Sequence, residues 1–110
     1  MIVIQVVPKA GINAYKLLRS QVLHAAATWE FSNKAKTRLR HIQSAGYIDI
    51  ANAGGVISAQ IHPKDRRDHF YLAEKFMGRL VAWFEDDLVA INLQFVEPEK
   101  KKKPKAKKRR

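Results

Sequence analysis

The spacing of apolar residues changes its period along this 110-residue chain, and this limits the possible folds most strongly. Residues 2–7 are short, β-branched and followed by Pro8, which favours a strand. Residues 88–96 alternate apolar and polar side chains, as in a strand with one buried face. From about residue 65 to residue 84, apolar side chains recur every three or four positions, as on one side of an α-helix. The pattern predicts a first strand, a last strand and a long helix before the last strand.

The segment that follows the first strand has helical spacing. Asn13 is a suitable N-cap, and apolar residues recur from there at intervals of three and four up to Trp29. A second stripe of this kind begins at Phe31 and ends near Ile42, out of phase with the first. Residues 14–44 are therefore expected to form one bent helix or two helices, with Gly46 as the C-terminal cap.

Two short alternating runs, residues 47–50 and 56–61, flank the sequence Asn52-Ala-Gly-Gly55. Asparagine and glycine adopt positive φ readily, so this pattern predicts a β-hairpin. The complete order is then strand, helix or helix pair, strand, strand, helix, strand.

This order predicts an α+β fold of the ferredoxin-like, split β-α-β-β-α-β type, with a four-stranded, mostly antiparallel sheet and the helices on one face. Residues 32–63, a helix followed by a glycine-turned hairpin, also resemble the recognition helix and wing of winged-helix DNA-binding proteins, which leaves a second fold open. The residues expected to face the helices are Ile2, Ile4, Val6, Ile48, Ile50, Ile57, Ala59, Ile61 and the odd-numbered residues of 88–96.

The positive charge is concentrated at the C-terminus. The chain has 21 Lys and Arg against 10 Asp and Glu, a net charge of +11, and residues 99–110 alone hold nine basic residues against one acidic residue. Such a segment cannot offset the entropy lost on ordering by burying apolar surface. We expect a single α+β domain over residues 1–98 and a disordered lysine-rich tail over residues 99–110.

Clustered basic residues attract phosphates, so the charge favours binding of nucleic acid or another polyanion. We expect a non-enzymatic protein associated with RNA, the ribosome or DNA, held by its tail and by a basic helix. The residues expected to contact phosphates are Lys34, Lys36, Arg38 and Arg40 on that helix, Arg66 and Arg67 before the long helix, and Lys100, Lys101, Lys102, Lys103, Lys105, Lys107, Lys108, Arg109 and Arg110 in the tail.

An alternative is a homodimer or other homo-oligomer that associates through the open face of the sheet, with the tail serving solubility or targeting. Tyr47 is the only aromatic residue expected on that face, which disfavours base stacking on the sheet. The polar residues expected on this face are Gln5, Tyr47, Ser58, Gln60, Asn92 and Gln94.

No motif assigns catalytic roles, so an enzyme of unassigned reaction stays open but is not our expectation. The chain has no cysteine, which excludes disulfides, thiol catalysis and zinc sites with Cys ligands. His62 and His69 lie near two aspartates, but their spacing matches no metal signature, and we expect neither metal nor cofactor. No apolar run has the length of a membrane span, so we expect no membrane partner and a cytoplasmic location, or a nuclear one in a eukaryotic cell.

Overall fold

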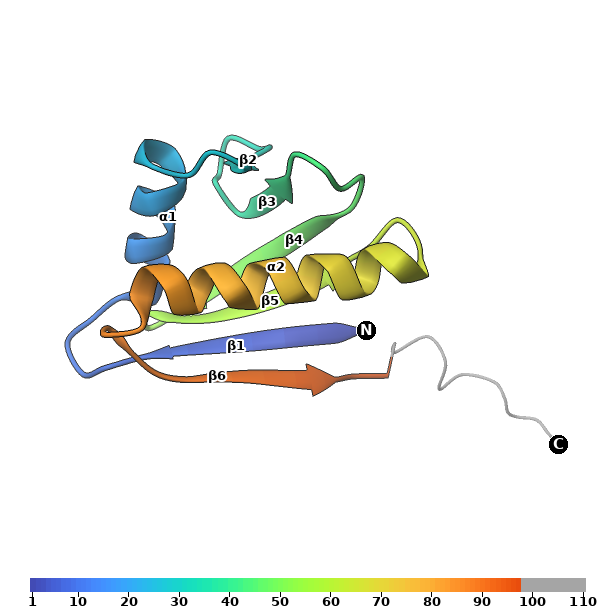
Figure 1. The fold of residues 1–110 in the computed structure, drawn as a ribbon. Coiled ribbons are helices and arrows are strands. Elements are labelled where there is room, and N and C mark those ends of the chain that lie inside the picture. Colours follow the sequence, from blue (N-terminus) through green and yellow to red (C-terminus); the bar gives the residue numbers. More distant parts are fainter. Residues whose placement is uncertain (98–110) are drawn as a thin grey trace, which may run out of the picture.

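The computed structural model describes residues 1–97, and Figure 1 shows their arrangement. These residues form two helices and one six-stranded sheet in which every pairing is antiparallel. The strand order is β2-β3-β4-β5-β1-β6. The elements along the chain are β1 (Ile2–Pro8), α1 (Ala14–His24), β2 (Trp29–Phe31), β3 (Arg38–His41), β4 (Tyr47–Ala53), β5 (Val56–His62), α2 (Arg66–Phe84) and β6 (Leu88–Phe95).

The predicted α+β class is confirmed, but the four-stranded layout is not, because the sheet has two additional strands, β2 and β3. The prediction of helix over residues 29–44 is wrong. Side chains in β3 alternate instead, with Leu39 and His41 buried and Arg38 exposed. Ile42, the last residue of the supposed helical stripe, is 56% exposed.

A turn between β2 and β3 explains why this segment is not helical. Asn33 accepts hydrogen bonds at Oδ1 from the backbone N–H groups of Thr37 and Arg38, at 3.0 and 2.9 Å. Lys36 has a φ of 59°, which an α-helix does not allow. Asparagine competes with helical hydrogen bonding in this way because its side chain bonds nearby backbone groups. The winged-helix alternative is also wrong, since β3 occupies the place of the expected recognition helix.

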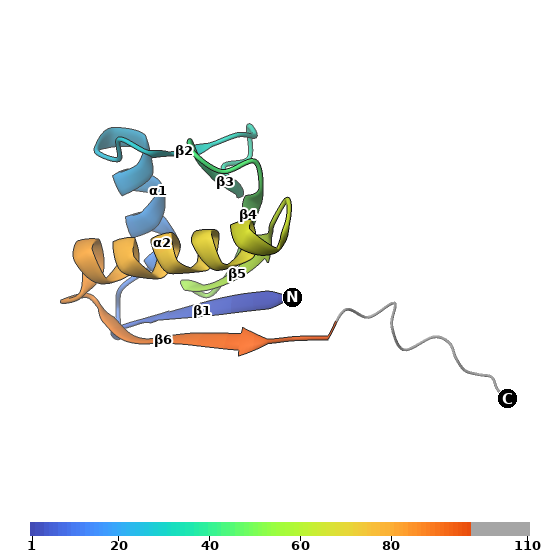
Figure 2. The same ribbon diagram turned by 45° about the vertical axis from the view of Figure 1, so that its right-hand side comes forward.

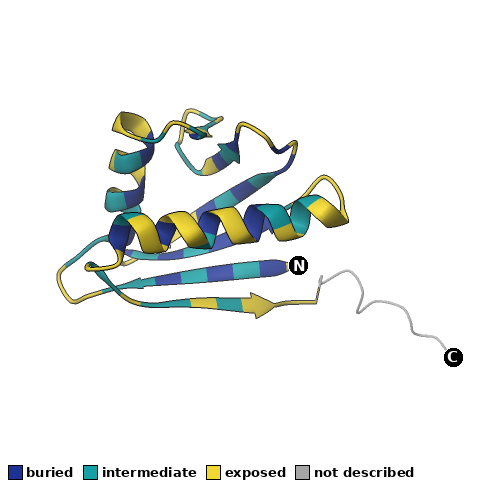
Figure 3. Ribbon diagram, in the orientation of Figure 1, coloured by how far each residue is buried: buried dark blue, intermediate teal, exposed yellow. Residues whose placement is uncertain are grey.

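The two helices cover one face of the sheet and share a single apolar core with it. Buried and less buried residues alternate along β1, in the first half of β4 and through most of β5, as expected, whereas no residue of β6 is buried (Figure 3). Phe76 and Leu18 are among the largest fully buried side chains, from α2 and α1 respectively. The strand residues in this core are Ile2, Ile4, Val6, Trp29, Leu39, Ile48, Ile50, Ile57, Ala59 and Ile61.

The N-terminal caps of both helices and the turn of the hairpin form at residues that the sequence predicted. Asn13 caps α1 by accepting a hydrogen bond from Lys16 N, and Asp65 caps α2 in the same way through Asp68 N, at 2.9 Å. Gly54 and Gly55 have φ values of 63° and 90° in the two-residue turn between β4 and β5, as a type I′ turn requires. Neither helix within residues 1–97 is long and apolar enough to cross a bilayer.

The expected tail, residues 99–110, lies outside the described residues. The strand β6 that precedes it lies at one edge of the sheet, beside β1, in both views of the fold (Figures 1 and 2).

Candidate functional site

The sheet face opposite the helices carries a cluster of polar and aromatic side chains from three neighbouring strands. Arg38 comes from β3, Tyr47 and Asp49 from β4, and His62 from β5. The strand register places Arg38 across from Asp49 and Tyr47 across from His62. The four side chains therefore meet on one face of the sheet, and we call them the Arg38–His62 cluster.

The Tyr47 ring is the centre of this cluster. Its centroid lies 4.8 Å from that of His62, with 18° between the ring planes, so the two rings are stacked. The guanidinium carbon of Arg38 lies 4.3 Å from the Tyr47 centroid, within the range of a cation–π contact. Because β4 lies between β3 and β5, Arg38 and His62 approach Tyr47 from opposite strands.

Asp49 supplies the negative charge of the cluster. Its Oδ1 lies 3.6 Å from Nε of Arg38, and its Oδ2 lies 3.2 Å from Nε2 of His62. The contact with His62 lacks hydrogen-bond alignment and becomes an ion pair only when the imidazole is protonated. Half-exposed pairs of this kind contribute at most about 1 kcal/mol to stability, so Arg38 remains available to a stronger anionic partner.

The other basic residues predicted near this region are divided between the open face and a turn. Arg40 lies on β3 beside the cluster, and its Nη1 is 3.6 Å from Oε2 of Glu30 on β2. Lys34 and Lys36 lie in the turn between β2 and β3 and not on a helix. Each arginine of β3 thus has an acidic neighbour, so the open face has little excess positive charge here.

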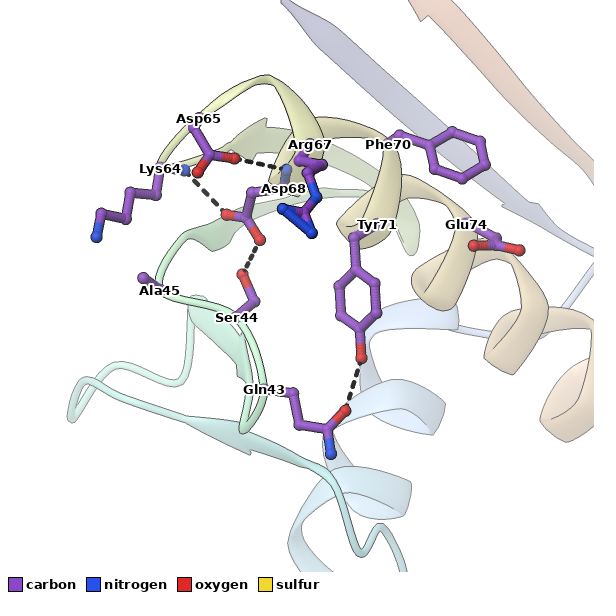
Figure 4. Close-up of a pocket in the computed structure, with 10 residues that line it drawn as sticks. All are labelled: Gln43, Ser44, Ala45, Lys64, Asp65, Arg67, Asp68, Phe70, Tyr71 and Glu74. Carbon is purple, nitrogen blue, oxygen red and sulfur yellow. Dashed lines mark hydrogen bonds between the residues drawn. The ribbon is translucent and has the colours of Figure 1, made fainter.

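Arg66 and Arg67 lie in the first turn of α2, on the helix side of the sheet. Arg66 lines an apolar hollow between α2 and β6, whereas Arg67 lines a separate hollow at the start of α2 (Figure 4). The structure therefore does not bring these arginines together with those of β3. The nine predicted tail residues lie outside the described part of the chain.

The polar residues that were predicted to share the open face do so. Gln5 lies across from Ser58 on one side and from Asn92 on the other, and Asn92 Nδ2 donates a hydrogen bond of 3.0 Å to its Oε1. Val3 is likewise flanked by Gln60 and Gln94. These amides extend from the Arg38–His62 cluster across β5, β1 and β6.

The chain leaves the described structure at the same end of the sheet as this cluster. The N–H groups of Met1 and Val96 each donate a hydrogen bond to the other residue's carbonyl oxygen, at 2.9 and 2.7 Å. The register of β1 and β5 pairs Val3 with Gln60, which puts His62 beside Met1. Strands lie about 4.8 Å apart, so the strand ends of β5 and β6 are separated by roughly 10 Å.

The hollow at the start of α2 has a volume of about 450 Å³, and several of the polar groups that line it bond one another. Asp68 accepts hydrogen bonds from Ser44 Oγ and from Lys64 N, and Tyr71 donates one to Gln43 Oε1 (Figure 4). These bonds tie the loop before β4 to α2. Ser44, Asp68 and Tyr71 bond partners within this junction, so their arrangement fits a structural role.

Two histidines, one on β3 and one on α2, have a lowered pKa. His41 is 6% exposed, accepts a hydrogen bond at Nδ1 from Gln43 N, and has its ring against Trp29 and Tyr71. Burial, and next the positive charge of Lys75, lower the pKa of His41 from its ordinary 6.5.

Burial, and next the N-terminal ammonium group, lower the pKa of His69 in the same way. Within residues 1–97, no three histidine, aspartate or glutamate side chains gather as a metal site would require.

The sequence interpretation missed His62 and Asp49 as members of the candidate site. The signal was present in the hairpin, because a two-residue turn at Gly54 and Gly55 sets the register that pairs Tyr47 with His62. The contact of Arg38 with Tyr47 could not be predicted, because the wrong helix prediction placed Arg38 away from the sheet.

The chain was compared with protein-family models, curated proteins and solved structures, and none of them matches it.

Proposed function

We propose that this protein binds single-stranded nucleic acid without catalysis, at the end of the sheet that carries the Arg38–His62 cluster. The observation that carries the proposal is the half-exposed stack of Arg38, Tyr47 and His62 at the end of the sheet where β6 ends. RNA and DNA are both within this proposal.

The stack has the chemistry of a base-binding platform. Proteins hold single strands by stacking bases on aromatic rings, worth about 1–3 kcal/mol per base, and by placing cations along the backbone. His62 and Arg38 pack against the Tyr47 ring and leave their own outer faces for a base to stack on. The guanidinium of Arg38 is also positioned to exchange Asp49 for a phosphate. The neighbouring amides of Gln60 and Gln94 can donate and accept hydrogen bonds at base edges.

The tail supplies the long-range attraction that the open face lacks. Arg38 and Arg40 are offset by Asp49 and Glu30, whereas residues 99–110 carry a net charge of +8. If about six tail charges meet phosphates, the logarithm of the binding constant falls against the logarithm of the salt concentration with a slope of about −4 on single strands and about −5 on B-form DNA.

The test is a fluorescence-anisotropy titration of labelled single-stranded RNA, single-stranded DNA and duplex DNA at two salt concentrations. The full chain, a chain lacking residues 99–110, and the variants Tyr47→Ala and Tyr47→Phe are compared. We expect deletion of the tail to remove most of the salt slope. Tyr47→Ala should weaken single-strand binding by about 1–3 kcal/mol, while Tyr47→Phe, which keeps the ring, should bind nearly as well as the full chain.

Two results contradict this proposal. The first is a tail-deleted protein that binds as tightly as the full chain at equal salt. The second is a Tyr47→Ala variant with unchanged affinity for every probe. That result would show that the stack does not contribute to binding, whatever the tail contributes.

We also propose that β4-β5-β1-β6 with α1 and α2 is a split β-α-β-β-α-β unit, extended at the β4 edge by β2 and β3. The order of these four strands and their antiparallel pairing support it. Cross-strand NOEs from β1 to both β5 and β6 are expected, and their absence on either side contradicts this plan.

Self-association is a second candidate function. The feature that favours it is the exposed edge of β6, which is a different surface from the open face considered from sequence.

A further inference from the structure

The strand β6 is an unprotected sheet edge. It pairs only with β1 among the described strands, and its outer side is free in both views (Figures 1 and 2). The eight residues of β6, LVAINLQF, include no charged residue and no proline. Proteins usually guard such edges with charge, proline or short length, as at the opposite edge, where β2 has three residues including Glu30.

The helix-side face of β6 is also largely uncovered. Ile91, Leu93 and Phe95 point to the helix side, because they lie across from the buried Val6, Ile4 and Ile2. Val89 is 67% exposed and Phe95 is 81% exposed. Large exposed apolar surfaces of this kind mark interaction sites.

An apolar hollow of about 660 Å³ continues this surface toward α2. It is lined by Leu93 and Phe95 of β6 and by Phe70, Ala73 and Met77 of α2, among others. Phe70 is itself 70% exposed. The groove is therefore apolar on both walls and is bounded on one side by a free strand edge.

The unpaired backbone groups on the free edge of β6 belong to Ile91, Leu93 and Phe95. Met1 and Val96 exchange two hydrogen bonds, and hydrogen-bonded residues alternate along an antiparallel pair. The N–H and C=O groups of Asn92 and Gln94 therefore point to β1. Those of Ile91, Leu93 and Phe95 point outward, whereas the register shift between Val7 and Pro8 interrupts the alternation at Val89.

We propose that the partner at this edge is a second copy of the chain, with the two β6 strands paired antiparallel about a two-fold axis at Asn92. In this register Ile91 pairs with the partner's Leu93 on both sides of the axis, and Phe95 lies next to the partner's Val89. Each pair satisfies the outward backbone groups and places apolar side chains together on the helix side. A two-fold interface requires such a self-complementary surface.

The composition of β6 suits pairing with an identical strand. Like charges that face each other across a strand pair are destabilising, and β6 has no charged residue that would meet its own copy. Antiparallel pairing puts the two Phe95 residues about 20 Å apart, so the two β6 strands end on opposite sides of the axis.

The tail of the same chain is not a suitable occupant of the apolar groove. Ala106 is its only apolar residue apart from proline, and nine of its twelve residues are basic. Burial of those charges in an apolar groove is strongly unfavourable.

The first test is sedimentation equilibrium of the full chain, treated with nuclease and kept at high salt so that nucleic acid does not bridge molecules. We expect a mass of twice 12.6 kDa at high concentration. Val89→Lys and Phe95→Glu should each raise the dimer dissociation constant at least about tenfold, because each substitution acts twice across the two-fold axis. Ile42→Lys, at an exposed apolar position away from β6, should leave the dimer unchanged, and circular dichroism checks that each variant is folded.

A second test needs no variant. Amide exchange in the wild-type chain should slow at Ile91 and Leu93 as protein concentration rises, while exchange at Asn92 and Gln94 should be protected at every concentration. A chain that remains a monomer at about 200 μM, or whose outward β6 amides exchange rapidly at that concentration, overturns the proposal. So does a dimer that is unaffected by both β6 substitutions, since it must use another surface.

Discussion

Replacing Gly46 with alanine should destabilise the fold because three neighbouring atoms occupy the space of a Cβ atom. That atom would lie 2.5 Å from the carbonyl oxygen of His62, 2.5 Å from Oδ2 of Asp68 and 2.9 Å from Cα of Pro63. Two of these are backbone atoms. Glycine is needed at position 46 because the backbone there passes close to the end of β5. The helix-capping role predicted from sequence is wrong, since no helix ends at this residue.

The third neighbouring atom, Oδ2 of Asp68, is also held in place. Asp68 accepts hydrogen bonds from Ser44 Oγ and Lys64 N, and moving its carboxylate away breaks contacts that join the loop before β4 to α2. Overpacking of this kind costs about 1–3 kcal/mol. We therefore expect Gly46→Ala to lower the free energy of unfolding by about 2 kcal/mol.

Gly78 provides a matched control because the same substitution should have the opposite effect. It lies within α2 with nothing inside 4 Å of a built Cβ atom. Alanine is favoured over glycine in a helix by about 0.8–1.0 kcal/mol, so Gly78→Ala should raise the free energy of unfolding. Urea unfolding followed by tryptophan fluorescence measures both variants. Two variants that shift stability in the same direction would refute the reasoning.

Two further predictions concern β3. Leu39→Ala should cost about 2–5 kcal/mol, because Leu39 is fully buried, while Ile42→Ala should change stability by less than about 0.5 kcal/mol; urea unfolding tests both, and similar losses contradict the β3 assignment. Since the pKa of His41 is lowered on folding, the unfolded chain binds more protons near pH 6.5 and stability should fall as pH decreases below this value. His69 acts in the same direction. Urea unfolding at pH 7.5, 6.5 and 5.5 measures the slope, which His41→Gln should reduce; stability that rises on acidification contradicts the assignment.

Much of the secondary structure could be predicted because it depends on local signals. Each of β1, β5, β6 and α2 has one dominant hydrophobic period, and the glycines at 54 and 55 favour the turn that joins β4 to β5. The segment from Phe31 to Ile42 has two competing patterns, a helical stripe and the alternation around Leu39. Hydrogen bonds from Asn33 and burial of Leu39 against the sheet select the strand, and neither is visible in apolar spacing.

The candidate site was predicted only in part for a related reason. The chain alone indicates that residues 47–62 form a hairpin, that its side chains alternate between two faces, and that positive charge gathers after residue 98. The sheet order brings Arg38 to Tyr47 and leaves β6 as a free edge. Periodicity is a property of neighbouring residues, whereas these contacts depend on which distant strands pair and in which register.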